Sequence, residues 1–209
     1  MCGRYLLTPD PDFYSRYSLS AQISLPPTLA DFSPGGRGLI VIRNQSQNQL
    51  ETALWGLIPF WAKDPKIGVK LFNARSETLA TKPAFSRSFF RQRCLVPASA
   101  FYEWQKSDTG KKVPYLVSLK DNQNFSLAGI SATWQDPQGN SVQTYTIITT
   151  QPNSLIAPIH HRMPVIISRP DENSYLNPDT SSSQLKKYLK PYPAALLRVE
   201  KLTRSSGRD

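Results

Sequence analysis

The second residue of the chain is a cysteine, in the opening stretch MCGRY, and this position gives it chemistry that an internal cysteine lacks. Cysteine is small enough to permit enzymatic removal of a preceding initiator methionine. Without Met1, Cys2 would carry an α-amine of ordinary pKa about 7.7–8.0 beside a thiol of ordinary pKa about 8.5. The amine can form a Schiff base with an aldehyde, and the thiol can then close a thiazolidine ring intramolecularly. The alternative is a terminal residue without a role.

A second candidate is Glu103, a carboxylate between two aromatic residues in the strand-like segment AFYEWQ. On an outer face of the protein it would be an ordinary surface residue. On an inner face, loss of hydration would raise its pKa and suit it to donate and accept protons near neutral pH. The sequence leaves both orientations open.

The two histidines of the chain are adjacent, His160 and His161 in IHHRMPV. Neighbouring side chains of a strand point in opposite directions, so we expect at most one of them to face a given site. A histidine pair can also bind a metal, but no cysteine or acidic residue lies near this pair at ligand spacing. We therefore expect no metal site.

Asn73 and Arg75, in LFNARSET, combine an amide with a guanidinium two residues later. Such a loop can present a hydrogen-bonding amide and a planar fork that grips phosphate. A helix N-cap and a surface arginine are the alternative. The remaining cysteine, Cys94, begins an apolar strand-like run and is expected in the core.

The charge balance favours a polyanionic partner, because 25 Lys and Arg stand against 15 Asp and Glu, a net charge of +10. Residues 63–93 contain eight basic side chains interleaved with aromatic ones, a combination that suits the phosphates and bases of single-stranded nucleic acid. Many of these rings are instead expected in the core. Two cysteines cannot form a disulfide framework, and no apolar run has the length of a membrane span. We therefore expect a cytoplasmic protein, associated with the nucleoid, or a nuclear one in a eukaryote.

Short strands separated by turns must position these residues, because 18 prolines punctuate the chain and no long helix is expected. Strands are predicted at 39–43, 50–55, 94–98, 101–105, 113–119, 125–134, 142–150 and 164–168. Short helices are predicted at 11–18, 76–80, 83–92 and 182–189. The pattern indicates an α+β fold, mainly antiparallel and barrel-like, in a single domain over residues 1–203 with a tail at 204–209.

Five segments together resemble the SRAP family, whose members covalently trap abasic sites in single-stranded DNA. The segments occur in the family's order and approximate spacing: MCGRY, WGLIPFWAKD (55–64), NARSET (73–78), CLVPASAFYEW (94–104) and HHRMPV (160–165). The resemblance spans essentially the whole chain. It implies the SRAP fold, no cofactor, a monomer, and single-stranded DNA with abasic sites as the partner.

The resemblance also implies roles for individual residues. Cys2 would be the nucleophile, and Asn73 the amide that hydrogen-bonds around the linkage. Glu103 would be the general acid and base beside the Cys2 amine, and His160 the residue that protonates the ring oxygen of the sugar. Phosphates beside the lesion would be held by Arg4, Arg75 and Arg162, and Trp61 would place a ring against the DNA at the lesion's edge.

Two segments depart from the family's usual pattern, the loop ADFSPGG (30–36) and the C-terminal LTRSSGRD. Because of these two departures, the resemblance does not indicate whether the protein prefers DNA ends or duplexes. Two other functions also remain open: a cysteine peptidase or amidohydrolase with an N-terminal nucleophile, and a module that binds single-stranded DNA without a covalent step. AP lyase activity and self-removal of Met1 are compatible with the abasic-site function.

Overall fold

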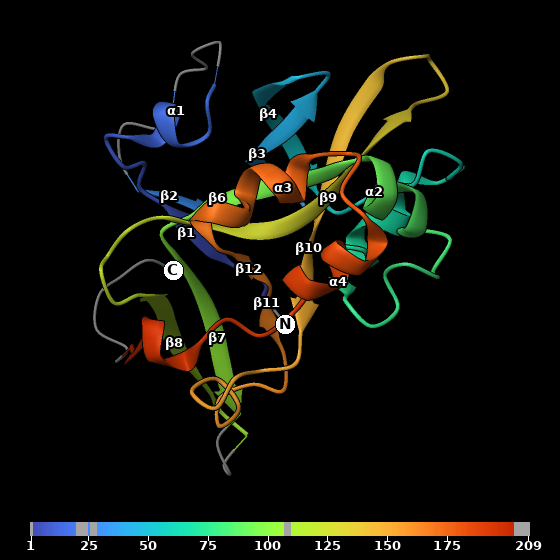
Figure 1. Cartoon of the computed structure of the whole chain (residues 1–209). Coiled ribbons are helices and arrows are strands. Elements are labelled where there is room, and N and C mark those ends of the chain that lie inside the picture. The colour runs from blue at the N-terminus through green and yellow to red at the C-terminus, as the bar shows by residue number, and fades with distance from the viewer. Residues whose placement is uncertain (1, 20–24, 26–28, 107–109, 203–209) are drawn as a thin grey trace.

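The computed structural model describes residues 2–19, 25, 29–106 and 110–202 (Figure 1). Its longer strands are β3 (Arg37–Asn44), β4 (Gln47–Trp55), β6 (Arg93–Ala98), β7 (Ala100–Lys106), β8 (Lys112–Leu119), β9 (Phe125–Gln135), β10 (Ser141–Thr150) and β13 (Leu197–Lys201). The shorter strands are β1 (Tyr5–Leu7), β2 (Ala30–Phe32), β5 (Asn73–Arg75), β11 (Met163–Pro164) and β12 (Ile166–Ile167). The α-helices are α1 (Phe13–Arg16), α2 (Ser86–Arg91), α3 (Glu172–Leu176) and α4 (Ser182–Tyr188). The 3₁₀ helices are η1 (Pro65–Lys70), η2 (Arg169–Asp171) and η3 (Ala194–Leu196).

The larger sheet closes on itself as a barrel. Its strands follow the path β10–β4–β3–β6–β9, and β9 pairs again with β10. Most of these pairs are antiparallel, but β10 runs parallel to β4 and to β5. The pairing with β5 sets Asn73 opposite Ile147, so the closed sheet fixes the backbone of one predicted site residue.

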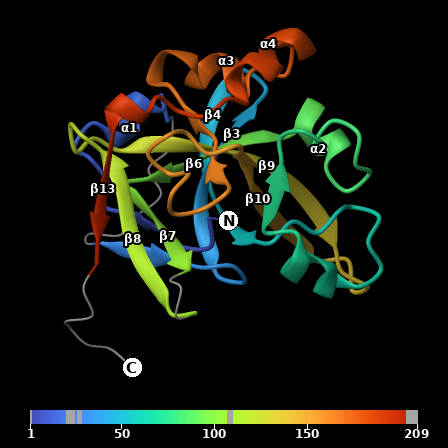
Figure 2. The same ribbon diagram turned by 90° about the horizontal axis from the view of Figure 1, so that it is seen from below.

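A second, antiparallel sheet has the strand order β13–β8–β7–β1–β2. It lies on one side of the molecule, with β9 and β10 of the barrel on the other side in both views (Figures 1 and 2). The first strand of the chain therefore belongs to this second sheet. Because β1 pairs with β7, Tyr5 lies opposite Phe101, and the start of the chain is brought beside the strand that carries Glu103.

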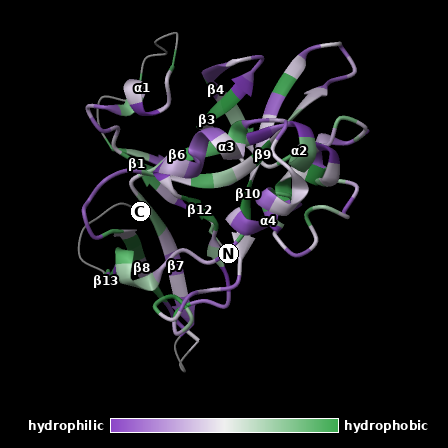
Figure 3. Cartoon of the chain, in the orientation of Figure 1, coloured by the Kyte–Doolittle hydropathy of each residue, from purple (hydrophilic) through white to green (hydrophobic). Residues whose placement is uncertain are grey.

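Two hydrophobic cores follow from the two faces of the barrel strands. One core fills the barrel and its junction with the second sheet, and it includes Cys2, Tyr5, Trp55 and Cys94. The other lies between the outer barrel face and the helices, with buried residues from α1 to α4. Figure 3 shows hydrophobic residues gathered on central strands such as β3 and β10, whereas peripheral loops are largely hydrophilic. The barrel strands are therefore buried on both faces, one toward each core.

The helices are attached to the barrel by buried charged side chains as well as by apolar packing. Arg93, at the start of β6, donates hydrogen bonds to the carbonyls of Phe89 and Phe90 (2.8 and 3.0 Å) and of Tyr175 (2.6 Å), and it also bonds the Asn177 carbonyl. These carbonyls lie at the C-terminal ends of α2 and α3, where a positive charge is favourable.

A buried ion pair joins α1 to α3. Arg16 donates to the Glu172 carboxylate at 2.6 Å, and Ser126 of β9 donates to the same carboxylate oxygen at 2.6 Å. Both side chains of the ion pair are almost fully buried. Since the carboxylate also receives the Ser126 hydroxyl, the charge is both paired and hydrogen-bonded, as a buried charge requires.

The fold class predicted from the sequence, mainly antiparallel and barrel-like, is confirmed. The predicted strands all occur, the last of them as the pair β11 and β12. The helix predicted at 76–80 is wrong, because this segment forms turns in which the Ser76 N–H still bonds the Thr149 carbonyl of β10. The predicted tail, 204–209, lies outside the described residues. Within the described part of the chain, no helix is long and apolar enough to cross a membrane.

Candidate active site

Glu103 faces inward from β7, with only 1% of its surface exposed. Its place opposite Tyr115 of β8 is set by the antiparallel pairing of the two strands. Burial raises the pKa of this carboxyl to about 7. Of the two orientations that the sequence left open, the structure therefore has the one suited to proton transfer, since a group of this pKa is populated in both forms near neutral pH.

His160 lies beside Glu103, with 3.9 Å between its Nδ1 and the Oε2 of the carboxylate. The backbone of Arg162 contacts Nδ1 through two groups, its N–H at 3.0 Å and its carbonyl oxygen at 3.1 Å. Burial lowers the pKa of His160 below its ordinary value. The neutral imidazole is therefore favoured.

The expectation that His160 and His161 point in opposite directions is wrong. Both lie in a loop that precedes β11, and their rings stack with centroids 4.4 Å apart and an angle of 27° between the planes. Strand alternation does not apply to a loop, which is why the sequence argument failed. Within the described residues, no group of three or more His, Cys, Asp and Glu side chains is placed to hold a metal ion.

Cys2 is completely buried between the two sheets. The Asn73 amide donates to the Cys2 carbonyl at 2.8 Å, which ties the start of the chain to β5. Burial, and then the nearby Glu103 carboxyl, raise the pKa of the Cys2 thiol. The structure thus brings together Cys2, Asn73, Glu103 and His160, which are dispersed over the sequence.

A cavity of about 380 Å³ opens at this cluster. Its lining includes Glu103 and His160 together with two lysines, Lys106 and Lys112, at the ends of β7 and β8. The two lysines place positive charge around the cavity that the Glu103 carboxyl also lines. The sequence argument missed them because their proximity depends on the pairing of β7 with β8, in which Lys106 lies opposite Lys112.

The predicted phosphate-binding arginines have different surroundings. Arg75 is exposed on β5, two residues after Asn73 and therefore on the same face of the strand. Arg4 is about half exposed, pairs with Asp31 of β2 at 2.5 Å, and lies 4.9 Å from the centre of the Tyr102 ring. A phosphate at Arg4 would therefore share the guanidinium with Asp31.

Arg162 is buried and already holds a carboxylate. It donates two hydrogen bonds to Glu77, at 2.6 and 2.9 Å, and one to the Thr149 carbonyl at 2.6 Å. Its guanidinium lowers the pKa of Glu77. These bonds lock the turn at 76–80 onto the segment that follows His160, so Arg162 positions the site through the backbone N–H that it gives to His160.

Trp61 is 50% exposed beside a shallow cavity lined by Lys63, Lys66 and Lys70. The neighbouring Phe60 is also exposed, and the Arg87 guanidinium lies 4.3 Å from the centre of its ring. Other rings of the basic stretch, Phe85 and Phe89, belong to the core, as the sequence argument allowed. The sequence analysis did not select Phe60, because the sequence does not show which of two adjacent aromatic residues is exposed.

Comparison with known families decides the classification of the chain. A family profile described as "SOS response associated peptidase (SRAP)" matches residues 1–207. The chain belongs to the SRAP family. It is 41% identical over 199 residues to the abasic site processing protein YoqW of Bacillus subtilis, covering 93% of this chain and 88% of that protein. It is 45% identical over 163 residues to the abasic site processing protein YoaM of the same organism, covering 78% of this chain and 72% of that protein.

Solved structures support the SRAP assignment at the level of the fold. A crystal structure of a protein from Bacteroides thetaiotaomicron superposes with a TM-score of 0.75 at 34% identity, covering 81% of this chain and 75% of that one. Another, from Bordetella bronchiseptica, gives a TM-score of 0.80 at 25% identity, covering 97% of this chain and 100% of that one. The barrel and the second sheet are therefore features that this SRAP chain shares with known structures.

Proposed function

We propose that this SRAP protein covalently traps abasic sites in single-stranded DNA through Cys2, after loss of Met1. The observation that carries the proposal is the convergence of a proton-transfer pair, Glu103 and His160, on the segment of Cys2 that Asn73 holds by its carbonyl. The names of the relatives, abasic site processing proteins, give independent support.

The chemistry needs an aldehyde, and the ring-opened sugar of an abasic site supplies one. The free α-amine of Cys2 adds to the aldehyde carbon, and loss of one water gives an imine. The thiol sulfur then adds to the imine carbon, and the thiol proton ends on the ring nitrogen. The product is a thiazolidine, formed from protein and sugar with release of one water, and its second step is favoured because it is intramolecular.

Glu103 can serve both proton transfers of this sequence. As a carboxylate it accepts a proton from the attacking amine, and as a carboxylic acid it protonates the departing hydroxyl. A pKa of about 7 makes both forms available without a large free-energy cost. His160 lies on the neighbouring loop, and its imidazolium form would donate a proton to the ring oxygen of the sugar as it opens and return to the neutral imidazole.

The DNA strand would cross the cavity between the lysine rim and the loop of Trp61. Arg75 and Arg4 are exposed for phosphates, Trp61 offers a ring for stacking, and Arg162 orients His160 from beneath. Burial of the Cys2 thiol keeps it protonated at neutral pH, so the amine attacks first and the thiol reacts only when the imine is beside it.

The test uses a single-stranded oligonucleotide with one abasic site and the purified full chain. We expect a protein–DNA band that survives heat and denaturant, and we expect Cys2→Ala to remove the band while salt-sensitive DNA binding persists. Cys94→Ala is the matched control, because Cys94 is equally buried but has no α-amine. A band of equal strength from Cys2→Ala would refute the proposal.

Intact mass spectrometry separates this proposal from a purely non-covalent function. The crosslink-competent protein should begin at Cys2, and an N-terminal extension that blocks its amine should abolish the crosslink although the thiol remains. Crosslinking by the extended chain would exclude the thiazolidine.

A further inference from the structure

A second pocket lies at one mouth of the barrel, and the interior rows of side chains become polar there. Ala53 and Trp55 of β4 face the barrel interior, and so does Tyr145 of β10. Because side chains alternate along a strand, Glu51 and Gln143 continue these two rows toward the mouth. The cavity measures about 310 Å³, at the lower end of the roughly 300–1,000 Å³ that is usual for small-molecule sites.

The carboxylate of Glu51 lacks a neutralising partner. It is half-buried, and burial raises its pKa. Arg43, from the same pocket, is instead bound to Asn48 at 2.7 Å and to Asn173 at 3.0 Å, and Arg93 is bound to backbone carbonyls. Among the described residues, nothing donates a hydrogen bond to Glu51. The carboxylate is therefore open to a ligand that brings N–H donors into the pocket, and an ionisable group with a shifted pKa in a concave pocket is a candidate binding group.

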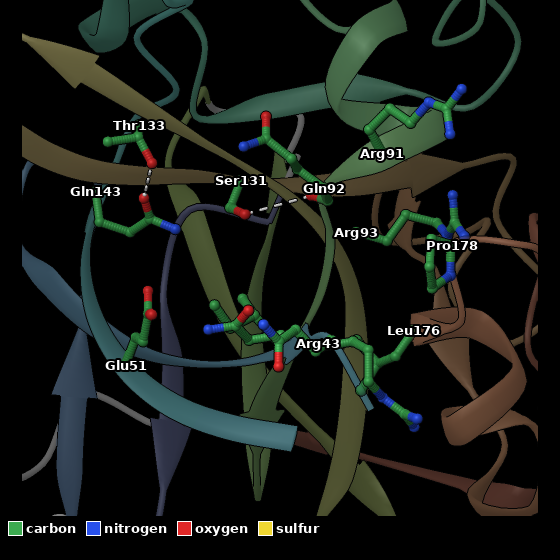
Figure 4. Close-up of a pocket in the computed structure, with 13 residues that line it drawn as sticks. Arg43, Glu51, Arg91, Gln92, Arg93, Ser131, Thr133, Gln143, Leu176 and Pro178 are labelled. Carbon is green, nitrogen blue, oxygen red and sulfur yellow. Dashed lines mark hydrogen bonds between the residues drawn. The ribbon is translucent and has the colours of Figure 1, made fainter. Parts of the chain in front are cut away.

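The groups around Glu51 define what the ligand must present. The Gln143 amide oxygen accepts from the Thr133 hydroxyl at 2.7 Å, which leaves its nitrogen to donate. Glu51 and Gln143 lie on one side of the pocket, and Arg91 and Pro178 lie on the other (Figure 4). The ligand therefore needs N–H donors for Glu51 and an acceptor for Gln143.

Guanine fits this pattern better than the other bases. Its N1–H and 2-amino group are adjacent donors that match the two oxygens of a carboxylate, as an arginine fork does. Its O6, next to N1, is an acceptor for an amide. Adenine and cytosine place a ring acceptor beside their amino group, and thymine has a single ring N–H between two carbonyls, so none of them offers two adjacent donors.

The remaining walls suit the rest of a nucleotide. Ile42 and Leu176 supply apolar surface for the face of the base. Arg91 is exposed at the end of α2, and the described residues include no hydrogen-bond or ion-pair partner for its side chain. A guanidinium at the rim is an effective ligand for phosphate.

We propose that this barrel mouth, lined by Glu51, Gln143 and Arg91, binds a guanine nucleotide at a site separate from Cys2. Glu51 accepts from N1–H and the 2-amino group, Gln143 donates to O6, and Arg91 binds the phosphate. The guanine comes from a free mononucleotide or from the end of a DNA strand, since both present the same base edge.

Isothermal titration calorimetry of the full chain with dGMP tests the proposal. We expect saturable binding of dGMP and at least about tenfold weaker binding of dAMP, and Glu51→Gln should weaken dGMP binding by about tenfold or more. Glu200→Gln, an equal charge change on exposed β13, is the matched control and should leave binding unchanged. Arg91→Ala should weaken binding of dGMP but not of deoxyguanosine. Competition between dGMP and an oligonucleotide with one terminal guanine distinguishes the two sources.

Three results would each overturn the proposal: no heat from dGMP at millimolar concentration, equal binding of dGMP and dAMP, or dGMP binding that Glu51→Gln leaves intact. Covalent trapping of abasic DNA is measured on the same proteins and should be unchanged in Glu51→Gln. Failure of the guanine site therefore leaves the proposed function standing, and failure of trapping leaves the guanine site standing.

Discussion

The carboxyl of Glu103 acquires its chemistry from burial, and burial has an energetic cost that can be measured. Its pKa is raised from 4.5 to about 7, so the folded protein binds this proton more tightly than the unfolded chain does. The contribution of Glu103 to stability is therefore most favourable below about pH 4.5, and it falls as the pH rises toward about 7. Above that range the folded state contains a buried carboxylate.

Glu103→Gln should thus stabilise the protein at high pH while it slows the chemistry. At about pH 8 we expect its free energy of unfolding to exceed that of the wild type by about 1–3 kcal/mol, because each unit of pKa shift corresponds to about 1.4 kcal/mol. The difference should shrink toward about pH 4.5. Urea denaturation at several pH values measures it, with the exposed Glu200→Gln as control.

The crosslinking rate provides the second readout for Glu103. In the wild type the rate of trapping should change with pH around about 7, where the carboxyl changes its protonation state, and Glu103→Gln should be slower and lack this dependence. A variant with wild-type rate and pH profile would remove Glu103 from the mechanism.

The short helices depend on Arg93 more than on their own hydrogen bonds. An isolated helix of five or six residues is unstable in water, and α3 and α2 are of this length. Arg93 binds backbone carbonyls at the ends of both helices, and the described residues include no carboxylate partner for it. The guanidinium is therefore satisfied by the two helix ends that it joins.

Arg93→Met should consequently cost about 2–4 kcal/mol of stability, because it leaves buried carbonyls without donors. Arg91→Met, two residues earlier and exposed, is the matched control and should change stability by no more than about 0.5 kcal/mol. Guanidinium chloride denaturation compares the two variants. Equal midpoints would show that Arg93 does not hold the helices.

Strand-like runs bounded by turn residues made the strands of the barrel predictable, but they could not reveal how the strands pair. Strands β1, β2 and β5 have three residues each, too few for a pattern, and they exist because longer strands offer them partners. The cluster around Cys2 was identified by resemblance to a family, whereas its lysine rim depends on a hairpin register. The helix predicted at 76–80 failed because Arg162 and Glu77, far apart in the sequence, fix a turn there instead.

The charge of the whole molecule sets the salt dependence that we expect for DNA binding. With a net charge of +10, the logarithm of the binding constant should fall with the logarithm of salt concentration at about 0.7 per phosphate contacted on a single strand. Changing Lys63, Lys66 and Lys70 to Gln should reduce this slope by at most about 2. Fluorescence anisotropy with an unmodified oligonucleotide measures it.

The same number of charges can be removed elsewhere as a control. Lys186, Lys187 and Lys190 are exposed on and after α4, and their replacement by Gln should alter the slope less than the change around Trp61. Equal slopes for the two triple variants would show that binding responds to net charge alone, and that the loop of Trp61 is not part of the DNA surface.

The complete burial of Cys2 has a consequence for the order of events during protein synthesis. Its neighbours in the folded protein include His160, which leaves the ribosome 158 residues later. At roughly 5–20 residues per second, that delay lasts on the order of 8–30 seconds. During this interval the nascent end remains accessible to an aminopeptidase, and afterwards the folded chain encloses the cysteine. An aminopeptidase that acts within this interval therefore removes Met1 before the cysteine is enclosed.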